Sequence, residues 1–392
     1  MSEMKRLEDL IVRDKRVLVR VDFNVPIHKG EVTDELRIEA ALPTIQYLLS
    51  QRAKVILTSH LGRPDGKPDP KYSLEPVAVL LSRLLKREVL FLHDCVGDAI
   101  EEKVMQMRAG QVALLENLRY HAEEEAGDPT FARALANLGE VYVDDAFAVA
   151  HRAHASVVGV PKLLPHAAGK LLQAEVSTLS HLMGTPKKPF AAIIGGAKIS
   201  DKIEFMKNLM KKADTIVISG AMANTFLAAQ GHDMRESILD KKGFTAAREI
   251  LAAAQRKNIE VILPVDVVVA SSPSSKRTRT VTVGQLDKGD MALDIGPAST
   301  TNIHVALQDA QTIFWNGTLG YTEEEAFRTA STAVAKTIAT SHALSVIGGG
   351  DTAGFVDSLG MHDKFGFIST GGGAALEFLA GKELPAVTAL IR

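Results

Sequence analysis

Short runs of β-branched and other apolar residues recur along the 392-residue chain, and each run leads into a polar or glycine-rich turn. Most of these turns are followed by residues with helical periodicity. The runs begin ten segments: 16–24, 54–64, 112–120, 141–152, 191–205, 215–223, 260–269, 312–320, 344–355 and 366–378. This alternation predicts an α/β fold in which helices cover parallel sheets.

A domain boundary is predicted in the middle of the chain. Residues 166–183 have the pattern of an amphipathic helix, which Gly184 and Pro186 end. Lys187, Lys188 and Pro189 then form a polar connector before the next apolar run. Because a chain of 392 residues is longer than one domain with a single hydrophobic core usually is, we expect two large α/β units.

The turns after the strands differ between the two halves. Ligands of open α/β sheets bind beyond the carboxyl ends of the strands, so these turns are the informative positions. The early turns carry Asp22, Asn24, His60, Arg63, Arg119 and Arg152, and the late turns carry Gly195, Gly196, Gly348 to Gly350 and Gly371 to Gly373. Arginine suits small phosphates and carboxylates, whereas glycine lets backbone N–H groups approach a longer phosphate chain. The first half is therefore predicted to bind a small anion and the second a nucleotide.

The triple glycine invites a second interpretation. Gly348, Gly350 and Ala353 fit the alanine-ended dinucleotide fingerprint, which would indicate an NAD-dependent dehydrogenase. The next strand, however, ends in Ser369 and Thr370 rather than in the acidic residue that would hold the ribose. A P-loop motif is also absent from the sequence.

Charged residues near predicted helix starts have both structural and functional interpretations. Asp351 with Thr352 is either a plain helix cap or part of a phosphate site. Lys198 and Lys202, spaced four apart, are either solvated or share one helix face beside a phosphate. Arg37 lies in a first turn, after a cap at Thr33 or Asp34, where positive charge opposes the helix dipole and favours an anionic partner.

Composition narrows the class of protein. The net charge is −2 and 46% of residues are hydrophobic, which indicates a globular chain without a surface for nucleic acid. The N-terminus lacks a signal sequence, no segment is long and apolar enough to cross a membrane, and Cys95 is the only cysteine, so we expect a cytoplasmic protein. A zinc site at His151 and His154 ranks below packing, and the basic cluster at 276–279 is expected to be a solvated hairpin loop.

Eight stretches in order carry a family resemblance: RVDFNVP, SHLGRP, ENLRY, DAFAVAHRAHAS, GGAKISDKI, WNGTLG, GGGDTAGF and STGGGAALEFL. Together they closely resemble the phosphoglycerate kinase family of the bacterial type, over essentially the whole chain. The resemblance implies two Rossmann-like domains whose parallel sheets face a central cleft, with the C-terminal segment packing back on the N-terminal domain. The expected parts are a phosphoglycerate-binding domain of 1–170 joined by 376–392, an interdomain helix and connector at 171–189, and a nucleotide-binding domain at 190–375.

The same resemblance implies Mg²⁺-dependent phosphoryl transfer between 1,3-bisphosphoglycerate and ADP, with domain closure, in a monomer. The expected substrate contacts are Asp22, Phe23, Asn24, Arg37, His60, Leu61, Gly62, Arg63, Arg119 and Arg152. The expected nucleotide contacts are Lys202, Gly220, Leu293, Asn316, Glu323, Gly349, Gly350, Asp351 and Thr352, with Asp351 near the metal. Arg37, Lys198 and Lys202 are the expected catalytic residues, and Gly371, Gly372 and Gly373 the loop at the transition state.

The chain departs from the usual family pattern at Ser219, Ala221, Asn224, Asp144, Ala148, Val149, Thr318 and Thr322. These departures leave the charged set intact. A catalytically silent binding protein on the same fold is the alternative, and retention of the arginines and both lysines argues against it.

Overall fold

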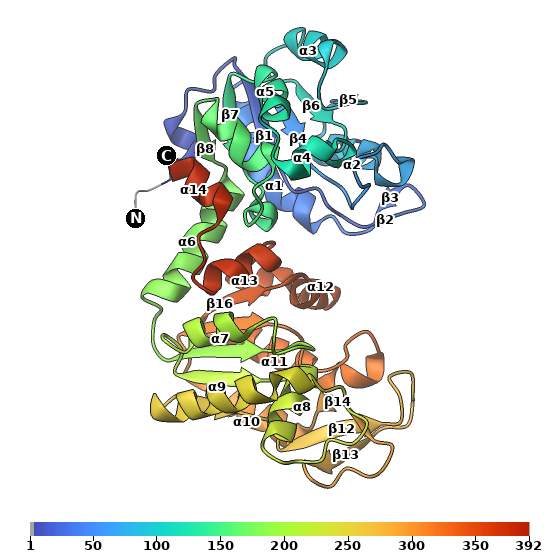
Figure 1. Ribbon diagram of the computed structural model, residues 1–392, viewed down its shortest axis with the longest axis vertical. Coiled ribbons are helices and arrows are strands. Elements are labelled where there is room, and N and C mark those ends of the chain that lie inside the picture. Colours follow the sequence, from blue (N-terminus) through green and yellow to red (C-terminus); the bar gives the residue numbers. More distant parts are fainter. Residues whose placement is uncertain (1–3, 392) are drawn as a thin grey trace. The chain divides into compact units, whose positions relative to one another are not determined.

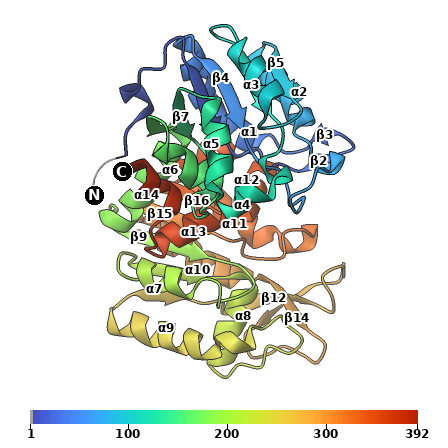
Figure 2. The same cartoon turned by 45° about the horizontal axis from the view of Figure 1, so that its top comes forward.

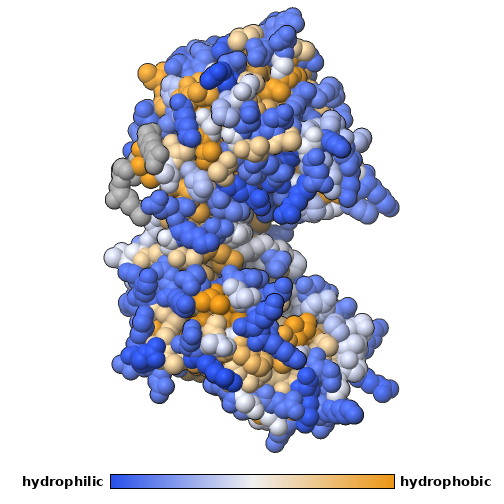
Figure 3. Space-filling view, viewed as in Figure 1, coloured by the Kyte–Doolittle hydropathy of each residue, from blue (hydrophilic) through white to orange (hydrophobic). Residues whose placement is uncertain are grey.

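The computed structural model describes residues 4–391 and confirms the predicted α/β class, with a parallel sheet in each of two compact units (Figure 1). The first unit takes in the described residues up to Ser177 and those from Glu383 onward, and the second runs from Thr178 to Lys382. None of the described helices is long and apolar enough to span a membrane. Hydrophilic residues predominate on the face shown in Figure 3, where hydrophobic residues form small separate areas.

Six parallel strands form the sheet of the first unit, in the order β5-β6-β4-β1-β7-β8. Their bounds are β1 Arg16–Arg20, β4 Lys54–Thr58, β5 Val89–Leu92, β6 Val112–Leu115, β7 Val141–Asp144 and β8 His166–Ala168; β2 Ile27–His28 and β3 Glu31–Val32 form a small hairpin. The chain passes from β1 to β4 on one side, while β7 pairs on the other side. The carboxyl end of β1 is therefore a switch point, the place where open α/β sheets bind ligands.

Helices cover this sheet because its central strands are apolar on both faces. The helices are α1 Leu36–Ser50, α2 Glu75–Leu85, α3 Asp98–Met105, α4 Ala122–Ala126, α5 Pro129–Asn137 and α14 Pro385–Ile391. On one face, α1 and α2 bury residues such as Ile45 and Leu81 against Val19 of β1. On the other, Tyr142 donates its hydroxyl to the carbonyl of Ser156 at 2.8 Å.

The sheet of the second unit also has six parallel strands, in the order β11-β10-β9-β15-β16-β17. Their bounds are β9 Phe190–Ile194, β10 Thr215–Ile218, β11 Glu260–Ile262, β15 Thr312–Asn316, β16 Leu344–Gly348 and β17 Phe367–Ile368. The helices are α7 Ile203–Leu209, α8 Gly220–Ala229, α9 Phe244–Arg256, α10 Pro297–Gln308, α11 Thr329–Thr340, α12 Gly350–Ser358 and α13 Gly373–Leu379. Helices α8 and α9 lie side by side (Figures 1 and 2), and α10 and α11 pack on Trp315, which is fully buried.

A separate three-stranded antiparallel sheet, in the order β13-β12-β14, completes the second unit. Its strands are β12 Asp266–Ala270, β13 Arg279–Thr282 and β14 Met291–Ile295, and the pairing of β12 with β13 confirms the expected hairpin around the basic loop. The prediction of one strand over 260–269 is wrong. The segment divides between two sheets on either side of Pro264, which has no N–H for a ladder.

The predicted helix over 166–183 begins later than expected. Residues 166–168 form β8 and pair with β7, so their backbone groups are satisfied by the sheet. Helix α6, Lys170–Gly184, starts where Asp145 Oδ1 accepts the N–H groups of Leu171 and Leu172 at 2.9 and 3.2 Å. The carboxylate caps this helix from the end of β7.

The compact units differ from the expected domains at the second boundary. The first boundary falls inside α6 after Ser177, within the expected connector 171–189, whereas residues 376–382, expected in the first domain, belong to the second unit. There Asn208 donates to the carbonyl of Leu379 at 2.6 Å, which ties α13 to α7. The last segment does return to the first unit, as expected, because the N–H of Ala386 donates to the carbonyl of Ala150 at 3.1 Å.

Candidate active site

In the first unit, an acidic side chain joins two of the predicted anion contacts. Asp22 follows β1 and is almost fully buried. Arg37, in the first turn of α1, donates to Asp22 Oδ2, and His60 Nδ1 lies 3.9 Å from Asp22 Oδ1. The anionic partner expected of Arg37 is therefore present within the protein, although its side chain keeps 31% of its surface exposed. The guanidinium can contact Asp22 and a ligand together.

His60 is held as a neutral histidine. Its ring is buried, and burial together with the charges of Arg20, Arg119 and Arg37 lowers its pKa well below the ordinary value. One of the Arg20 nitrogens lies 3.3 Å from His60 Nδ1. Arg20 itself is fully buried.

Arg20 belongs to a buried network beneath the strand ends. Its Nε donates to Ser156 Oγ at 2.9 Å, and Ser156 Oγ donates to Glu124 Oε1 at 2.6 Å. Glu124 also accepts the N–H of Ser156 at 2.9 Å. This carboxylate and hydroxyl give the buried guanidinium the partners that it needs at this depth.

Hydrogen bonds with two other predicted substrate contacts hold the turn after β4 in place. Arg119, which is buried, donates to the carbonyl of Gly62 at 2.7 Å and pairs with Glu125 at 3.1 Å. Asn24 Oδ1 accepts the N–H of Gly62 at 2.9 Å. The turn that bears His60 is thus held rigidly by other predicted substrate contacts.

The remaining predicted substrate contacts fall into two groups. Arg63 is exposed and Arg152 half-buried, and the guanidinium group of neither makes a hydrogen bond or ion pair with the described part of the chain. Their guanidinium groups are therefore available to an anion. Phe23 and Leu61 are buried in the core, so their side chains serve packing.

In the second unit, Lys202 lies at the carboxyl ends of the central strands. Its Nζ donates to the carbonyl of Gly195 at 2.6 Å and to Asn316 Oδ1 at 2.5 Å. Burial lowers the pKa of this ammonium group from 10.5 to about 8, although the nearby charge of Asp351 opposes the shift. A lysine held in this way carries its charge in a site with little solvent.

The helix shared by Lys198 and Lys202 is not formed. Helix α7 begins at Ile203, so both lysines lie in the turn before it, and Lys198 is exposed. Gly195 and Gly196 follow β9, and Gly196 has φ +129°, a backbone conformation that an α-helix does not contain. The predicted grouping of both ammonium groups on one helical face is therefore wrong.

Close contacts with backbone or side-chain atoms explain two glycines at these strand ends. A Cβ on Gly195 would lie 2.2 Å from the carbonyl oxygen of Thr318. Gly349 has φ +92°, and a Cβ there would lie 2.8 Å from Asn316 Nδ2. The same amide donates to the carbonyl of Gly348 at 2.8 Å, which joins β15 to β16.

The helix-cap interpretation of Asp351 is also wrong. Gly349 is the N-cap of α12, and the helix begins at Gly350, so Asp351 and Thr352 lie within its first turn. Thr352 Oγ1 accepts the N–H of Gly317 at 2.7 Å, while the carboxylate of Asp351 is exposed. Nothing lies within 4 Å of a Cβ built on Gly350, so this helix start is open to a ligand.

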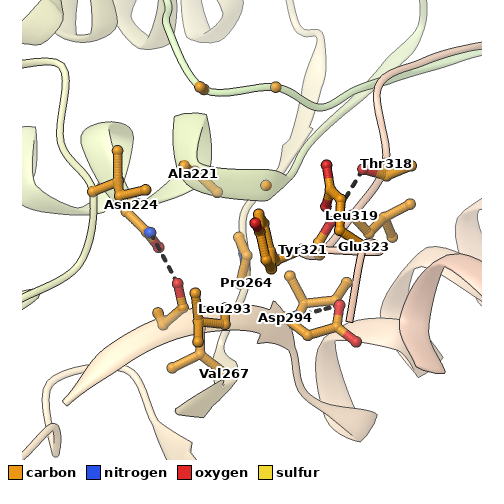
Figure 4. A pocket seen from close by; sticks show the side chains of 18 of the residues that line it. Ala221, Asn224, Pro264, Val267, Leu293, Asp294, Thr318, Leu319, Tyr321 and Glu323 are labelled. Atoms are coloured by element: carbon orange, nitrogen blue, oxygen red, sulfur yellow. Dashed lines mark hydrogen bonds between the residues drawn. The ribbon is translucent and has the colours of Figure 1, made fainter. Parts of the chain in front are cut away.

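A cavity of about 280 Å³ lies beside these strand ends. Four of the predicted nucleotide contacts line it: Gly220, Leu293, Glu323 and Asp351. Figure 4 shows Leu293, Pro264 and Val267 near one another, with Tyr321 and Glu323 close to Leu319. Lys202, Asn316, Gly349, Gly350 and Thr352 are not among the lining residues. The cavity has the largely apolar wall and few polar groups typical of a small-ligand site.

Several lining residues were missed by the sequence prediction. Pro264, Val267 and Ile238 form apolar walls but have the same sequence signal as core residues. Asn224 donates weakly to the carbonyl of Ala292 at 3.5 Å (Figure 4). Glu323 lies in a turn rather than at a helix start, because the next helical turn begins at Glu325.

Asp294 is a buried acid in the cavity wall, and it was also missed. It accepts the N–H groups of Ile295 at 2.9 Å and of Ala330 at 3.2 Å, the latter at the start of α11. Burial raises its pKa from 3.8 to about 7, which outweighs these hydrogen bonds. The carboxyl group supports a helix start behind the cavity.

The predicted transition-state loop forms an open turn before α13. Gly372 has φ +50° and is the N-cap of this helix, which begins at Gly373. Nothing lies within 4 Å of a Cβ built on either residue. The N–H of Gly371 donates to Ser369 Oγ at 3.1 Å, so Gly372 and Gly373 form the open part of this turn after β17.

Comparison with known proteins decides the family. The family model described as "Phosphoglycerate kinase" matches residues 7–382. The chain belongs to the phosphoglycerate kinase family. Its members are phosphotransferases, so this chain is an enzyme of that class. Two curated relatives of that name, from Pelotomaculum thermopropionicum and Moorella thermoacetica, are 50% identical over 388 residues and 51% identical over 385 residues. These alignments cover 99% of both chains in the first case and 98% of both in the second.

Solved structures of the family agree with this fold. Phosphoglycerate kinase from Coxiella burnetii matches with a TM-score of 0.88 at 38% identity, covering 99% of both chains. The enzyme from Pyrococcus horikoshii matches with a TM-score of 0.87 at 33% identity, covering 99% of this chain and 98% of the other.

Proposed function

We propose that this chain catalyses reversible phosphoryl transfer from 1,3-bisphosphoglycerate to ADP, giving 3-phosphoglycerate and ATP. The family match over residues 7–382 is the observation that supports this most strongly. The site chemistry agrees, because arginines gather at the strand ends of one unit and a lysine with glycine turns at those of the other.

The first unit is proposed to bind phosphoglycerate. Arg63 and Arg152 have guanidinium forks without partners in the described chain, and Arg37 is partly exposed beside Asp22. Such forks bind phosphate and carboxylate oxygens bidentately. Arg119 positions the turn at Gly62. Neutral His60 can donate one hydrogen bond to the ligand without adding charge.

The second unit is proposed to bind ADP or ATP. The apolar wall of the cavity, which includes Leu293, suits a nucleobase, and Glu323 can accept hydrogen bonds from ribose hydroxyls. The open start of α12 at Gly349 and Gly350 can donate backbone N–H groups to phosphate oxygens. Thr352 and Asn316 support this start through their hydrogen bonds to the neighbouring strand ends.

Lys202 is proposed to stabilise charge on the transferring phosphoryl group. In the free protein its ammonium is shared between Gly195 and Asn316, and its pKa is about 8. An arriving phosphate would favour the charged form, so nucleotide binding near pH 8 should take up a proton. Exposed Lys198 and partly exposed Arg37 are proposed to assist by adding positive charge.

Mg²⁺ is proposed to bind with the nucleotide near Asp351. The carboxylate of Asp351 is exposed at the cavity, without a hydrogen-bond donor in the described residues, and carboxylate oxygen is a ligand type that Mg²⁺ uses. When bound, the ion would neutralise phosphate charge. The residues of this chain would orient the nucleotide and the carboxyl phosphate.

No general base is needed for this reaction, because a carboxylate is the acceptor or leaving group for the phosphoryl group. Positioning and charge stabilisation should therefore provide most of the rate. The open turn at Gly371 to Gly373 is proposed to donate backbone N–H groups as the phosphoryl group moves. We expect the enzyme to act as a cytoplasmic monomer in glycolysis or gluconeogenesis.

The test is a coupled assay with the full chain. With 3-phosphoglycerate and MgATP, the acyl phosphate formed is reduced by an auxiliary NADH-dependent enzyme. We expect NADH consumption that requires both substrates and is proportional to the amount of this chain. A flat trace from folded protein would reject the proposed activity and would favour a catalytically silent binding protein.

A further inference from the structure

A group of three potential metal ligands lies in the first unit outside the proposed substrate contacts. One ligand atom each from Asp94, Cys95 and His121 lies within 4.8 Å of the other two. Asp94 and Cys95 follow β5, and His121 follows the turn 118–120 after β6. Since β5 and β6 are parallel neighbours, their carboxyl ends bring these segments together.

Hydrogen bonds hold the group in place. The ring nitrogen Nε2 of His121 and Asp94 Oδ1 are 2.7 Å apart, and the same oxygen accepts the N–H of Cys95 at 2.7 Å. The carbonyl of Asp94 accepts the N–H of Glu116 at 3.4 Å. Two chain segments are therefore joined at this point before any ion binds.

The donor set identifies the class of ion. One thiol sulfur, one imidazole nitrogen and one carboxylate oxygen are the ligands of Zn²⁺ and related thiophilic ions, whereas Mg²⁺ and Ca²⁺ prefer oxygen alone. We propose that Asp94, Cys95 and His121 form a binding site for a thiophilic divalent cation, with Zn²⁺ as the natural candidate. Solvent would provide the fourth ligand of a tetrahedral ion.

Exposure allows an ion to enter. The side chains of Asp94 and His121 keep 50% and 28% of their surface exposed, while Cys95 is fully buried behind them. An ion approaching from solvent would meet the carboxylate and the imidazole first and the sulfur last. The nitrogen and oxygen ligands of a tetrahedral zinc ion are about 3.4 Å apart. His121 Nε2 and Asp94 Oδ1, which are 2.7 Å apart in the free protein, therefore have to separate slightly when the ion binds.

The binding step balances in protons. Burial raises the pKa of the Cys95 thiol well above its ordinary value, so the free protein holds the thiol proton. The ion takes the sulfur as a thiolate, and this proton leaves to solvent. The proton on Nε2 of His121, which the hydrogen bond to Asp94 uses, moves to Nδ1 through solvent, so that the Nε2 lone pair can bind the ion. The ion would then link the loop after β5 to the start of α4.

Cobalt spectroscopy tests the proposal directly. Because Cys95 is the only cysteine, a thiolate-to-Co²⁺ charge-transfer band can arise from this residue alone. The full chain, untagged and freed of metal, is titrated with Co²⁺ and then with Zn²⁺. We expect the band to saturate at about one ion per chain and to disappear as Zn²⁺ displaces Co²⁺. No band at saturating Co²⁺ would reject the site.

Variants show whether all three residues bind the ion. We expect no band in Cys95→Ser, and at least about tenfold weaker Co²⁺ binding in His121→Gln and Asp94→Asn. The matched control is His93→Gln, an exposed neighbouring histidine outside the group, which should keep the band and its affinity. Equal affinity in His121→Gln and in the unmodified chain would show that the imidazole is not a ligand and would overturn the proposal. This outcome is independent of kinase activity, because the readout is the metal itself.

Discussion

Neutralising Asp294 should change how the stability of the second unit depends on pH. Burial raises the pKa of this carboxyl group from 3.8 to about 7. Between these values the folded protein holds a proton that the unfolded chain has released, so the free energy of unfolding should fall as pH rises from 4 to 7. In Asp294→Asn that decrease should be largely lost.

The size of the effect follows from the shift. It spans roughly three pH units, and each corresponds to about 1.4 kcal/mol, so Asp294 contributes at most about 4 kcal/mol of pH dependence. The amide of asparagine has nearly the same shape and can still accept the N–H of Ala330, which is 3.2 Å from the carboxylate. The variant should therefore fold and differ mainly in slope.

Trp315 provides the assay. It is the only tryptophan, it is fully buried, and it lies in the second unit, so its fluorescence follows the unfolding of that unit by urea. Unfolding curves are measured from pH 4 to pH 7 for the unmodified chain, for Asp294→Asn and for Asp309→Asn, an exposed aspartate in the same unit. Asp309→Asn should keep the unmodified slope. If Asp294→Asn keeps it too, the buried acid does not govern the pH dependence and the reasoning fails.

Two further substitutions test the strand ends. Gly195→Ala should lower the free energy of unfolding, measured with urea, by about 3 kcal/mol, because its Cβ would lie 2.2 Å from the carbonyl oxygen of Thr318. The control Gly184→Ala, at a glycine with open space around it, should unfold with a free energy within about 0.5 kcal/mol of that of the unmodified chain. A tolerated Gly195→Ala would mean that the close approach does not constrain this turn. Arg119→Lys should lower kcat/KM for 3-phosphoglycerate by about 10- to 100-fold, because it loses a charged hydrogen bond to Gly62, while the Kd for ATP stays unchanged. Steady-state kinetics measure kcat/KM and calorimetry measures the Kd for ATP, with Arg133→Lys, at an exposed arginine, as the control. Equal losses of affinity for 3-phosphoglycerate and for ATP would contradict a role of Arg119 in the substrate-binding turn.

The sequence predicted the main strands well because burial on both faces leaves continuous apolar runs. It missed β5 and β8, which lie at the edges of the first sheet. β8 is only His166–Ala168, without β-branched residues, and its pairing with β7 takes residues that also fit a helical pattern. The helical periodicity of residues 166–168 could not show that they would instead pair with β7 in the sheet.

The placement of charged residues such as Asp22 and His60 at the strand ends could be predicted, because each comes soon after a strand and the parallel topology brings these ends to one edge of the sheet. Their partners could not be predicted. Asp22 with Arg37, and Lys202 with Asn316, are pairs that only the fold brings together. The ligand group at Asp94 and His121 was missed for the same reason, since these residues are far apart in sequence and neither stands out alone.

Turnover of a Lys202 variant tests the central claim most directly. In the coupled assay with 3-phosphoglycerate and MgATP, Lys202→Met should lower kcat by about 10²- to 10³-fold, with unchanged far-ultraviolet circular dichroism. The control Lys207→Met, an exposed lysine of α7 paired with Glu204, should keep the kcat of the unmodified chain. A folded Lys202→Met whose kcat stays within severalfold of that value would contradict the proposed stabilisation of the transferring phosphoryl group by this ammonium.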